Sequence, residues 1–506
     1  MEVQVEVTPP MRAGHRQVFS GIAGPADGRR VTKGSTLKQT RVIAVGSAAV
    51  AALALVAGVA AFHPGKDFGI SVQNDLNDRS QQLFGISGTL DAVSGQTVTT
   101  PGTAAAKLAN SLKAELVTDQ IKSPADMIAF WPDDASPQYT ISCIEGPSSD
   151  SAHNGVQRVN IATGEVATIL TGTGSCDGIR RTPWGTILAT EERSDGNAIE
   201  IFDPIGTMDQ TVDRTAHTSS SPNIVFRPAL GNFAWEGIVI LDDGTLYAGD
   251  ENRPSSGKIG GTIYKFVPAT PRSGSGDISD PALSPFVAGV LSALQLGDGS
   301  SFGQGANYGK GEWIGPIVAA SARADAQAKG ASGFWRPEDM DRDPLFGGGV
   351  RACFTATGNA ATHLYGEVDC FTDAPSGPEV QPFVIGSPEF TMPDNVAFQP
   401  GTGILYVLED IGGVNNFNDD VWACLPDGAD GDILSDGCVR VAVNLDGAGT
   451  DGREGSEWTG MIFAADGKTA YIHMQHRSDP ANPLQTRATD DEMRITGFKV
   501  GSFGGD

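Results

Sequence analysis

The sequence predicts an all-β protein, a six-bladed β-propeller with a metal site at the mouth of its central channel. Three observations carry this prediction. The 506 residues include 65 Gly and 30 Pro, which is typical of many short elements joined by tight turns. One hairpin pattern recurs six times, and a carboxylate opens each copy. With 40% hydrophobic and 19% charged residues, the chain has the composition of a globular protein with a large core.

The charge balance is strongly acidic, with 61 Asp+Glu against 35 Lys+Arg and a formal net charge of -26. A field of this sign repels phosphate backbones, so the composition excludes most nucleic-acid binders. Any anion that the protein binds must therefore meet a local cation or a metal ion.

Residues 1–62 have the features of an export segment. Residues 1–41 carry seven Lys+Arg against three Asp+Glu, and an uninterrupted apolar run follows from Val42 to Phe62. This pattern predicts a signal peptide, with Val59-Ala60-Ala61 as small residues for cleavage, or a retained N-terminal membrane anchor. Either alternative places the rest of the chain outside the cytoplasm, in the periplasm or the extracellular space. Residues 63–120 are rich in Ser, Thr, Gly and Ala, and we expect a linker or peripheral wrap there.

Residues 121–506 contain the repeat. Its clearest copy is WEGIVILDDGTLYAGDENR, in which Asp243-Gly244 marks a hairpin turn between two apolar strands. The opening carboxylates of the six copies are Asp126, Asp177, Glu236, Glu338, Asp394 and Glu457. Their intervals suit one propeller blade each, because a blade needs about 40 to 50 residues. The longest interval, 102 residues, predicts an insertion around Asp298 to Lys310.

Hairpin geometry predicts that these carboxylates converge. The start of the first strand lies beside the end of the second, so Glu236 should neighbour Asp250-Glu251, and Asp394 should neighbour Glu409-Asp410. A ring of close carboxylates needs cations to stay ionised, and clusters of oxygen ligands select hard cations, above all calcium. The alternative is that these residues are solvated turn residues of an ordinary propeller.

Several segments resemble the signature blocks of one enzyme family. CDGIRRTPWGTILATEE, FWRPED, MPDNVAFQP and EGSEWTGMIFAADGKTAYIHMQH, spread from residue 176 to residue 476, are similar to blocks of the PhoX-type alkaline phosphatases. The resemblance implies an exported six-bladed propeller that hydrolyses phosphate monoesters with an iron and calcium cluster at the channel mouth.

The resemblance also implies a set of site residues. Cys176 matches the cysteine ligand to iron, and Arg336 matches the arginine that holds phosphate, with Arg336 and Glu338 as the catalytic pair. We assign no firm role to Glu457 and His476, which lie in matching segments. The carboxylate ligands to metal are expected to be Glu192, Glu236, Glu251, Glu338 and Asp394.

The six cysteines are compatible with disulfides in an exported chain. Two pairs lie close in sequence, Cys353 with Cys370 and Cys424 with Cys438. Cys143 and Cys176 leave two alternatives open, a third disulfide or Cys176 as a ligand to iron. The disulfide would remove the thiolate that iron requires.

The function that we expect is hydrolysis of small phosphate monoesters by a monomer, with a metal-bound oxide or hydroxide as the nucleophile. The Gly303 to Gly311 stretch fails the spacing of a phosphate-binding loop. One alternative is a non-catalytic calcium-binding propeller with calcium loops at Asp427 to Asp432 and Asp446 to Asp451. Another is a calcium-dependent propeller hydrolase such as a lactonase or a phytase.

Overall fold

The computed structural model describes residues 70–93, 102–146, 152–255, 258–297, 307–410, 418–426, 433–446 and 455–501. The chain divides into two units, residues 1–57 and 58–506, and every described residue lies in the second. The predicted export segment, residues 1–62, therefore lies outside the described residues. Across the described ranges, we find no helix with the length and apolar character needed to cross a bilayer.

Strands dominate the described chain, and the predicted all-β class is confirmed. Two sheets come from the first part of the chain. The first runs β11 (Thr218–Ser219), β10 (Gln210–Asp213), β6 (Val166–Thr171), β5 (Gly155–Asn160), β4 (Tyr139–Ile144), β3 (Ala125–Trp131). The second runs β12 (Ile224–Phe226), β9 (Ala198–Ile201), β8 (Ile187–Glu191), β7 (Cys176–Arg181).

The middle of the chain forms a sheet of nine strands. Its order is β13 (Trp235–Ile240), β14 (Leu246–Asp250), β15 (Ile263–Pro268), β16 (Gly289–Leu296), β17 (Gly309–Ile314), β21 (Gly377–Ile385), β20 (Glu367–Ala374), β19 (Val350–Ala356), β18 (Pro337–Arg342).

Two more large sheets and a hairpin complete the β-structure. One sheet runs β1 (Ala106–Leu108), β25 (Cys438–Asn444), β24 (Asp420–Cys424), β23 (Leu405–Glu409), β22 (Pro393–Phe398). The other runs β2 (Lys113–Lys122), β30 (Thr489–Thr496), β27 (Thr469–Gln475), β26 (Glu457–Phe463). The hairpin pairs β28 (Ser478–Asp479) with β29 (Asn482–Thr486). The helices are α1 (Ile70–Asp78), α2 (Ser80–Leu83) and α3 (Ala322–Lys329).

Short 3₁₀ turns connect several of these elements. They span Thr103–Ala105, Pro228–Leu230, Pro281–Leu283, Pro285–Val287, Ala319–Ser321 and Ala360–Thr362.

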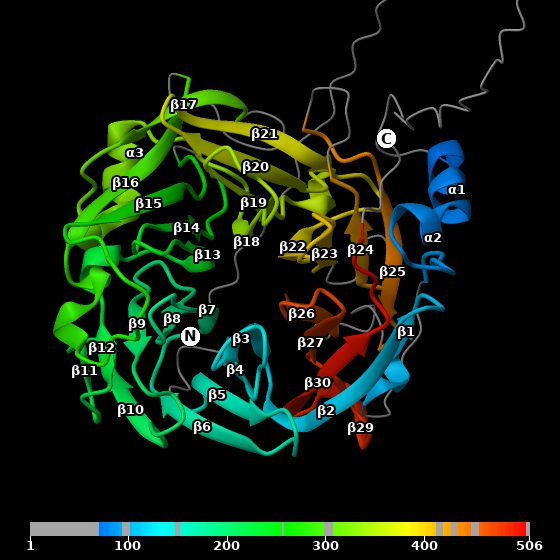
Figure 1. Cartoon of the computed structure of the whole chain (residues 1–506), viewed down its shortest axis with the longest axis horizontal. Coiled ribbons are helices and arrows are strands. Elements are labelled where there is room, and N and C mark those ends of the chain that lie inside the picture. The colour runs from blue at the N-terminus through cyan, green and yellow to red at the C-terminus, as the bar shows by residue number, and fades with distance from the viewer. Residues whose placement is uncertain are drawn as a thin grey trace, which may run out of the picture. The chain divides into compact units, whose positions relative to one another are not determined.

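The sheets are arranged around a centre, as in a β-propeller. The strands β3, β7, β13, β18, β22 and β26 surround the centre in Figure 1, and each contacts the next, with β26 returning to β3. Successive strands of each sheet run outward from these six. The predicted propeller-like arrangement is therefore confirmed.

The number of separate blades differs from the prediction. Four described sheets have the four to six strands of a single blade, rather than the six such sheets expected, and the nine-stranded sheet takes up the rest of the ring. The cause is β17, which pairs with β16 on one side and with β21 on the other. β17 lies at the end of the predicted insertion, at Gly309–Ile314, and joins two groups of strands that would otherwise be separate.

The segment expected to be a linker or peripheral wrap, residues 63–120, contributes strands to the ring. β2 pairs with β30 from the C-terminal part of the chain, and β1 pairs with β25. Pairing between the two ends of a propeller chain covers strand edges that would otherwise be unpaired. The described part of this segment therefore adds the outermost strand to two of the sheets.

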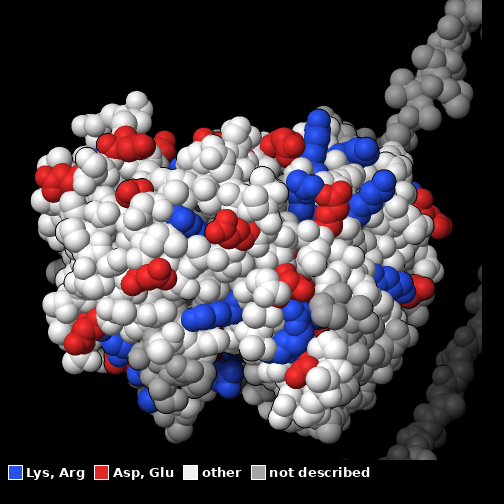
Figure 2. Space-filling view, turned by 90° about the horizontal axis from the view of Figure 1, so that it is seen from below, with Lys and Arg blue, Asp and Glu red and all other residues white. Residues whose placement is uncertain are grey.

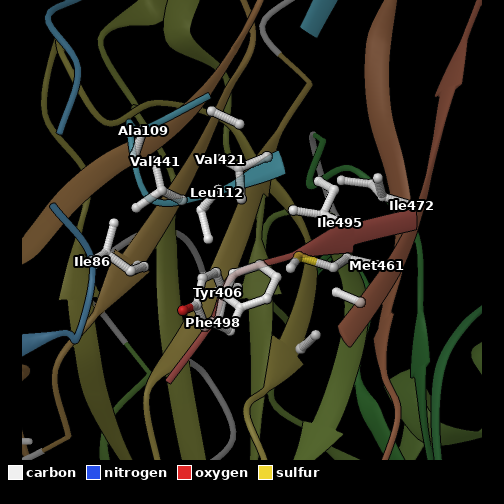
Figure 3. Packing of buried hydrophobic residues seen from close by; sticks show 14 of the residues in the cluster. Ile86, Ala109, Leu112, Tyr406, Val421, Val441, Met461, Ile472, Ile495 and Phe498 are labelled. Carbon is white, nitrogen blue, oxygen red and sulfur yellow. The ribbon is translucent and has the colours of Figure 1, made fainter. Parts of the chain in front are cut away.

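Apolar side chains fill the space between neighbouring sheets. The cluster in Figure 3 packs residues of β23, β25, β26, β27 and β30 against α2 and the residues flanking β1. Tyr406 and Phe463 contact Phe498 with ring centroids 5.4 and 5.0 Å away. The two disulfides between cysteines close in sequence, Cys353–Cys370 and Cys424–Cys438, each join directly opposite residues of neighbouring strands.

Candidate metal and phosphate site

Five of the inner strands share one irregularity near their first residue. In β3, β7, β13, β18 and β22 the first residue pairs normally, and the register then shifts so that two residues oppose one on the partner strand. Such β-bulges re-aim side chains and are common beside functional sites. The residue after the first is the opening carboxylate of the repeat in all five strands, Asp126, Asp177, Glu236, Glu338 and Asp394.

The second strand of each hairpin brings a further carboxylate to the same end. β4, β8, β14 and β23 are each followed immediately by an acidic residue, Glu145, Glu192, Glu251 and Asp410. The opening residues of the inner strands pair with the closing residues of these strands, as in Trp235 with Asp250. The predicted convergence of carboxylates therefore occurs in the structure.

Three groups of carboxylates bring ligand atoms within 4.8 Å of one another. Asp177 belongs to two of them, so five carboxylates form one continuous group, Asp126, Glu145, Asp177, Glu192 and Glu236. The third group joins Asp394, Asp410 and Glu457. Among the predicted ligands, Glu192, Glu236 and Asp394 lie in these groups. The other two, Glu251 and Glu338, form ion pairs with Arg336.

Sequence reasoning found most of this site but left out part of it. Asp126, Asp177, Asp410 and Glu457 were recognised as repeat positions without being assigned as ligands. Glu145 was missed. Its signal is its position one residue after a second strand, the same position that Glu192 and Glu251 occupy.

Burial and mutual repulsion raise the pKa values of these carboxyl groups. Burial is the larger cause, followed by neighbouring acids, and together they raise the pKa of Glu145 and of Asp394 to about 8. The same causes hold the pKa values of Asp126, Asp177 and Glu236 well above their usual range. Cations bound among them would reverse these shifts.

The donor set fits hard cations. One carboxylate oxygen of Asp126 and one of Asp177 are buried and accept no hydrogen bond from the described part of the chain. Buried polar atoms without partners are rare, and oxygen-only ligand groups of this kind are typical of calcium sites. The described residues therefore satisfy what a calcium ion requires.

Arg336 is the main cation beside these groups. Its Nε donates to Glu251 at 2.8 Å, its Nη2 lies 2.8 Å from a Glu338 oxygen, and Asp410 is 4.0 Å away. Arg336 has φ 54°, a strained conformation for a residue with a side chain. Ser175 and Met392, which precede the inner strands β7 and β22 in the same way, also have positive φ.

Two acids next to site residues, Glu191 and Asp250, form contacts that support the fold instead. Glu191 accepts hydrogen bonds from the Gly174 and Asn197 amides and from Arg214, and Asp250 is paired with Arg323 at 2.9 Å. Of the Asp250-Glu251 pair, Asp250 therefore supports the fold and Glu251 belongs to the candidate site. Glu251 faces Arg336, and Asp250 is tied to α3.

The side chains of Glu457 and His476 lie close to each other in the structure. Glu457 accepts a hydrogen bond from Gln475 and lies 3.7 Å from the His476 Nε2 atom. Of the alternative calcium loops, Asp446 is paired with Arg477 at 2.7 Å. Residues 427–432 and 447–451 lie outside the described residues.

Cys176 departs from its predicted role as an iron ligand. It forms a disulfide with Cys143, a pairing that links β7 to β4. A disulfide sulfur carries no thiolate charge and is not the ligand that iron prefers. The structure thus corrects the assignment of Cys176 and leaves the site with carboxylate oxygens alone.

Part of the excess of Asp and Glu over Lys and Arg in the chain is located at this site. Ten carboxylates lie near Arg336. They are Asp126, Glu145, Asp177, Glu192, Glu236, Glu251, Glu338, Asp394, Asp410 and Glu457. On the face seen in Figure 2, acidic and basic side chains are interspersed. The carboxylates of the site therefore form a buried group of negative charges that metal ions can neutralise.

Comparison with known proteins bears on this geometry. The model of the family described as "Alkaline phosphatase PhoX" matches residues 138–378. This match confirms the resemblance to PhoX. The matched segment includes Cys176, Glu192, Glu236, Glu251, Arg336 and Glu338, and it ends before Asp394.

Solved structures with some similarity to this chain were also found. PhoX of Pseudomonas fluorescens, in complex with vanadate as a transition state analogue, has a TM-score of 0.59 and 17% identity, covering 83% of this chain and 99% of its own. The PQQ-bound aldose sugar dehydrogenase of Streptomyces coelicolor has a TM-score of 0.37 and 14% identity, covering 77% and 99%. No match was found among curated proteins. The family match supports a PhoX-like alkaline phosphatase, and the first structure supports the propeller fold.

Proposed function

We propose that the chain is an exported, metal-dependent phosphatase that releases inorganic phosphate from small phosphate monoesters. The observation that carries this proposal is the position of Arg336. A single guanidinium lies between Glu251 and Glu338, beside carboxylate groups that can hold several cations. A planar two-pronged donor next to bound cations is suited to a phosphoryl group.

The fold of the proposed enzyme is a six-bladed propeller with the site at the channel mouth. The nine-stranded sheet contains two inner strands, β13 and β18, and β17 joins their two blades at the outer edge. Counting these blades separately agrees with six inner strands in ring contact.

We propose calcium at the two carboxylate groups, one around Asp177 and one around Asp394. The disulfide at Cys176 argues against an iron site built on that residue. When bound, the metal ions would neutralise the carboxylates and supply an activated hydroxide for attack on phosphorus.

The chain's own residues have separate tasks in this reaction. Arg336 would bind two phosphoryl oxygens and stabilise the charge that grows during transfer. Glu251 and Glu338 would hold the guanidinium in place through their 2.8 Å contacts. The hydroxyl oxygen of Thr357 lies 3.2 Å from Glu338 Oε1 and 2.9 Å from the Pro393 carbonyl, so this hydroxyl lies between Glu338 and the neighbouring inner strand.

Location and assembly follow from the sequence. The basic and apolar pattern of residues 1–62 supports export to the periplasm or the exterior, with cleavage or with attachment to the membrane. We propose a monomer that acts on soluble phosphoesters.

The test combines elemental analysis with a phosphatase assay on p-nitrophenyl phosphate, before and after chelation. Calcium in the purified protein, with activity lost on chelation and restored by calcium, would support the proposal. Glu338→Gln should lower activity strongly while the protein stays folded. Bound calcium without phosphatase activity would instead favour the non-catalytic propeller, and bound iron would contradict the calcium-only assignment.

A further inference from the structure

A cavity of about 530 Å³, lined mainly by polar residues, includes Asn252, which follows Glu251 of the proposed site. Its walls come from five segments, the residues after β8, the β10–β11 connection, the residues before β13, the loop after β14, and α3 with the turn before it. Ser194, Thr215 and Ser321 contribute hydroxyl groups to it, and Asn232 and Asn252 contribute amides.

Basic side chains outnumber acidic ones in the lining of this cavity, whereas acidic residues outnumber basic ones in the whole chain. Arg214, Lys258 and Arg323 line it against one acid, Asp195. Arg214 is paired with Glu191 and Asp195, and Arg323 is paired with Asp250. Lys258 is exposed and forms no ion pair with any residue that the structure describes. One ammonium group is therefore available to an incoming anion, in a protein whose net charge is -26.

The loop that carries Lys258 is attached to the segment that carries Arg336. The Asn252 carbonyl accepts from the Arg336 amide at 3.2 Å and from the Gly261 amide at 3.1 Å. Gly261 also forms a bridge with Phe334. The two segments touch so closely that a Cβ on Gly333 would lie 1.7 Å from the Ile259 carbonyl.

The other wall of the cavity is tied to the site as well. Arg323 of α3 donates to the Glu251 carbonyl at 3.1 Å, and the Glu251 carboxylate contacts Arg336 at 2.8 Å. Two connections through the adjacent residues Glu251 and Asn252 therefore link the walls of this cavity to Arg336.

We propose that this cavity binds the leaving group of the substrate and favours phosphomonoesters whose alcohol part carries hydroxyls and a second negative charge. Lys258 recognises that second charge, and the hydroxyl and amide groups bind the rest. The inference rests on the proposed phosphatase function. It assigns Lys258 a role in specificity and none in the chemical step.

Two esters with the same carbon skeleton provide the test. 3-Phosphoglycerate carries a carboxylate where glycerol 3-phosphate carries a hydroxymethyl group. In the calcium-loaded full chain, Lys258→Ala should lower kcat/KM for 3-phosphoglycerate about tenfold, as expected for loss of a charge-assisted hydrogen bond. The value for glycerol 3-phosphate should change less than about twofold, because no second anion is present.

Lys468→Ala is the matched control. Lys468 is exposed at the turn between β26 and β27, at the opposite end of the strands from Glu457. Its removal changes the net charge equally, so equal effects of the two variants would overturn the proposal. An equal loss on both esters in Lys258→Ala would overturn it too.

Calorimetric titration with 3-phosphoglycerate separates the cavity from the reaction. Weaker binding in Lys258→Ala than in Lys468→Ala would support the cavity, even in a protein without turnover. Failure of the wild type to hydrolyse either ester would count against the phosphatase proposal alone. Unchanged binding in Lys258→Ala would overturn the proposed role of the cavity.

Discussion

At the scale of single residues, the site depends on placing many like charges around one arginine. Arg336 contacts Glu251 and Glu338, and its strained backbone is held between the Asn252 carbonyl and the Thr357 amide. Strain of this kind persists where surrounding contacts impose it and is concentrated at functional sites. The identity of the side chain should therefore matter more than its charge alone.

Arg336→Lys tests this point. Lysine keeps the positive charge but cannot contact two phosphoryl oxygens with a planar fork, so we expect kcat/KM for p-nitrophenyl phosphate to fall roughly a hundredfold. Arg342→Lys, at the far end of the strand β18 that follows Arg336 and exposed away from the mouth, should leave the rate unchanged. Similar rates for wild type and Arg336→Lys would exclude two-pronged phosphate binding by this residue.

The raised carboxyl pKa values predict how stability responds to pH. Glu145 and Asp394 have a pKa of about 8 in the metal-free fold and about 4 when unfolded. Between these values the folded state binds more protons, so the free energy of unfolding should fall as pH rises. In chelator, Tm should be lower at pH 8.5 than at pH 5.5.

Calcium should oppose this trend, because it binds the deprotonated carboxylates. The difference in Tm with and without calcium should grow as pH rises, and Glu145→Gln should reduce the pH dependence in chelator. A metal-free protein that becomes more stable from pH 5.5 to pH 8.5 would contradict the assigned burial of these groups.

At the scale of elements, the bulges on the inner strands connect packing to the site. The residue that follows the opening carboxylate is Gly178 in β7 and Gly237 in β13, and both lie against the next inner strand. A Cβ on Gly237 would lie 2.0 Å from the Met340 amide nitrogen. Close contact between inner strands is therefore what brings the carboxylates of different blades together.

Gly237→Ala should separate these strands. The added methyl meets backbone rather than a movable side chain, so we expect a loss of about 2 kcal/mol or more in the free energy of unfolding. Calcium affinity should fall as well. Gly276→Ala, where a Cβ meets nothing within 4 Å, is the control and should change little. Denaturant unfolding measures both variants.

The Cys143–Cys176 disulfide joins strands of neighbouring sheets across 33 residues of sequence. Replacing both cysteines with serine should cost about 2–4 kcal/mol in the free energy of unfolding and leave calcium content unchanged. Alkylation of the unfolded, unreduced protein should modify no cysteine, as read by intact mass. Labelled cysteine together with bound iron would instead restore the thiolate assignment of Cys176.

At the scale of the whole molecule, strands from the start and the end of the described chain close the ring. β2 lies along β30, and β1 extends the neighbouring sheet beside β25 (Figure 1). The inner strands contact in an unbroken cycle, so we expect the ring to unfold cooperatively.

Removing residues 1–122 should disrupt this closure. The deletion leaves β30 without its outer neighbour and exposes an unpaired edge, so thermal unfolding should begin at a lower temperature and aggregation should increase. Removing residues 1–69 keeps both strands and serves as the comparison. Equal melting curves for the two truncated chains would show that β1 and β2 are dispensable.

Local sequence patterns were enough to predict the all-β class, the repeated hairpin and most of the carboxylates at the site. Alternation and turn residues such as Asp243-Gly244 specify a hairpin, and a hairpin necessarily brings its two ends together. Glu236 and Glu251 could be paired in this way without any knowledge of the fold.

The contacts between blades could not be predicted from the sequence, because they join segments that are far apart along the chain. The pairing of Cys143 with Cys176, the joining of two blades by β17 and the return of β2 to β30 each link segments that no local pattern connects. The division of Asp250 from Glu251 arose in the same way, since Arg323 comes from a distant helix. Partners brought together by the closed ring decide which acids serve the fold and which are left for metal ions.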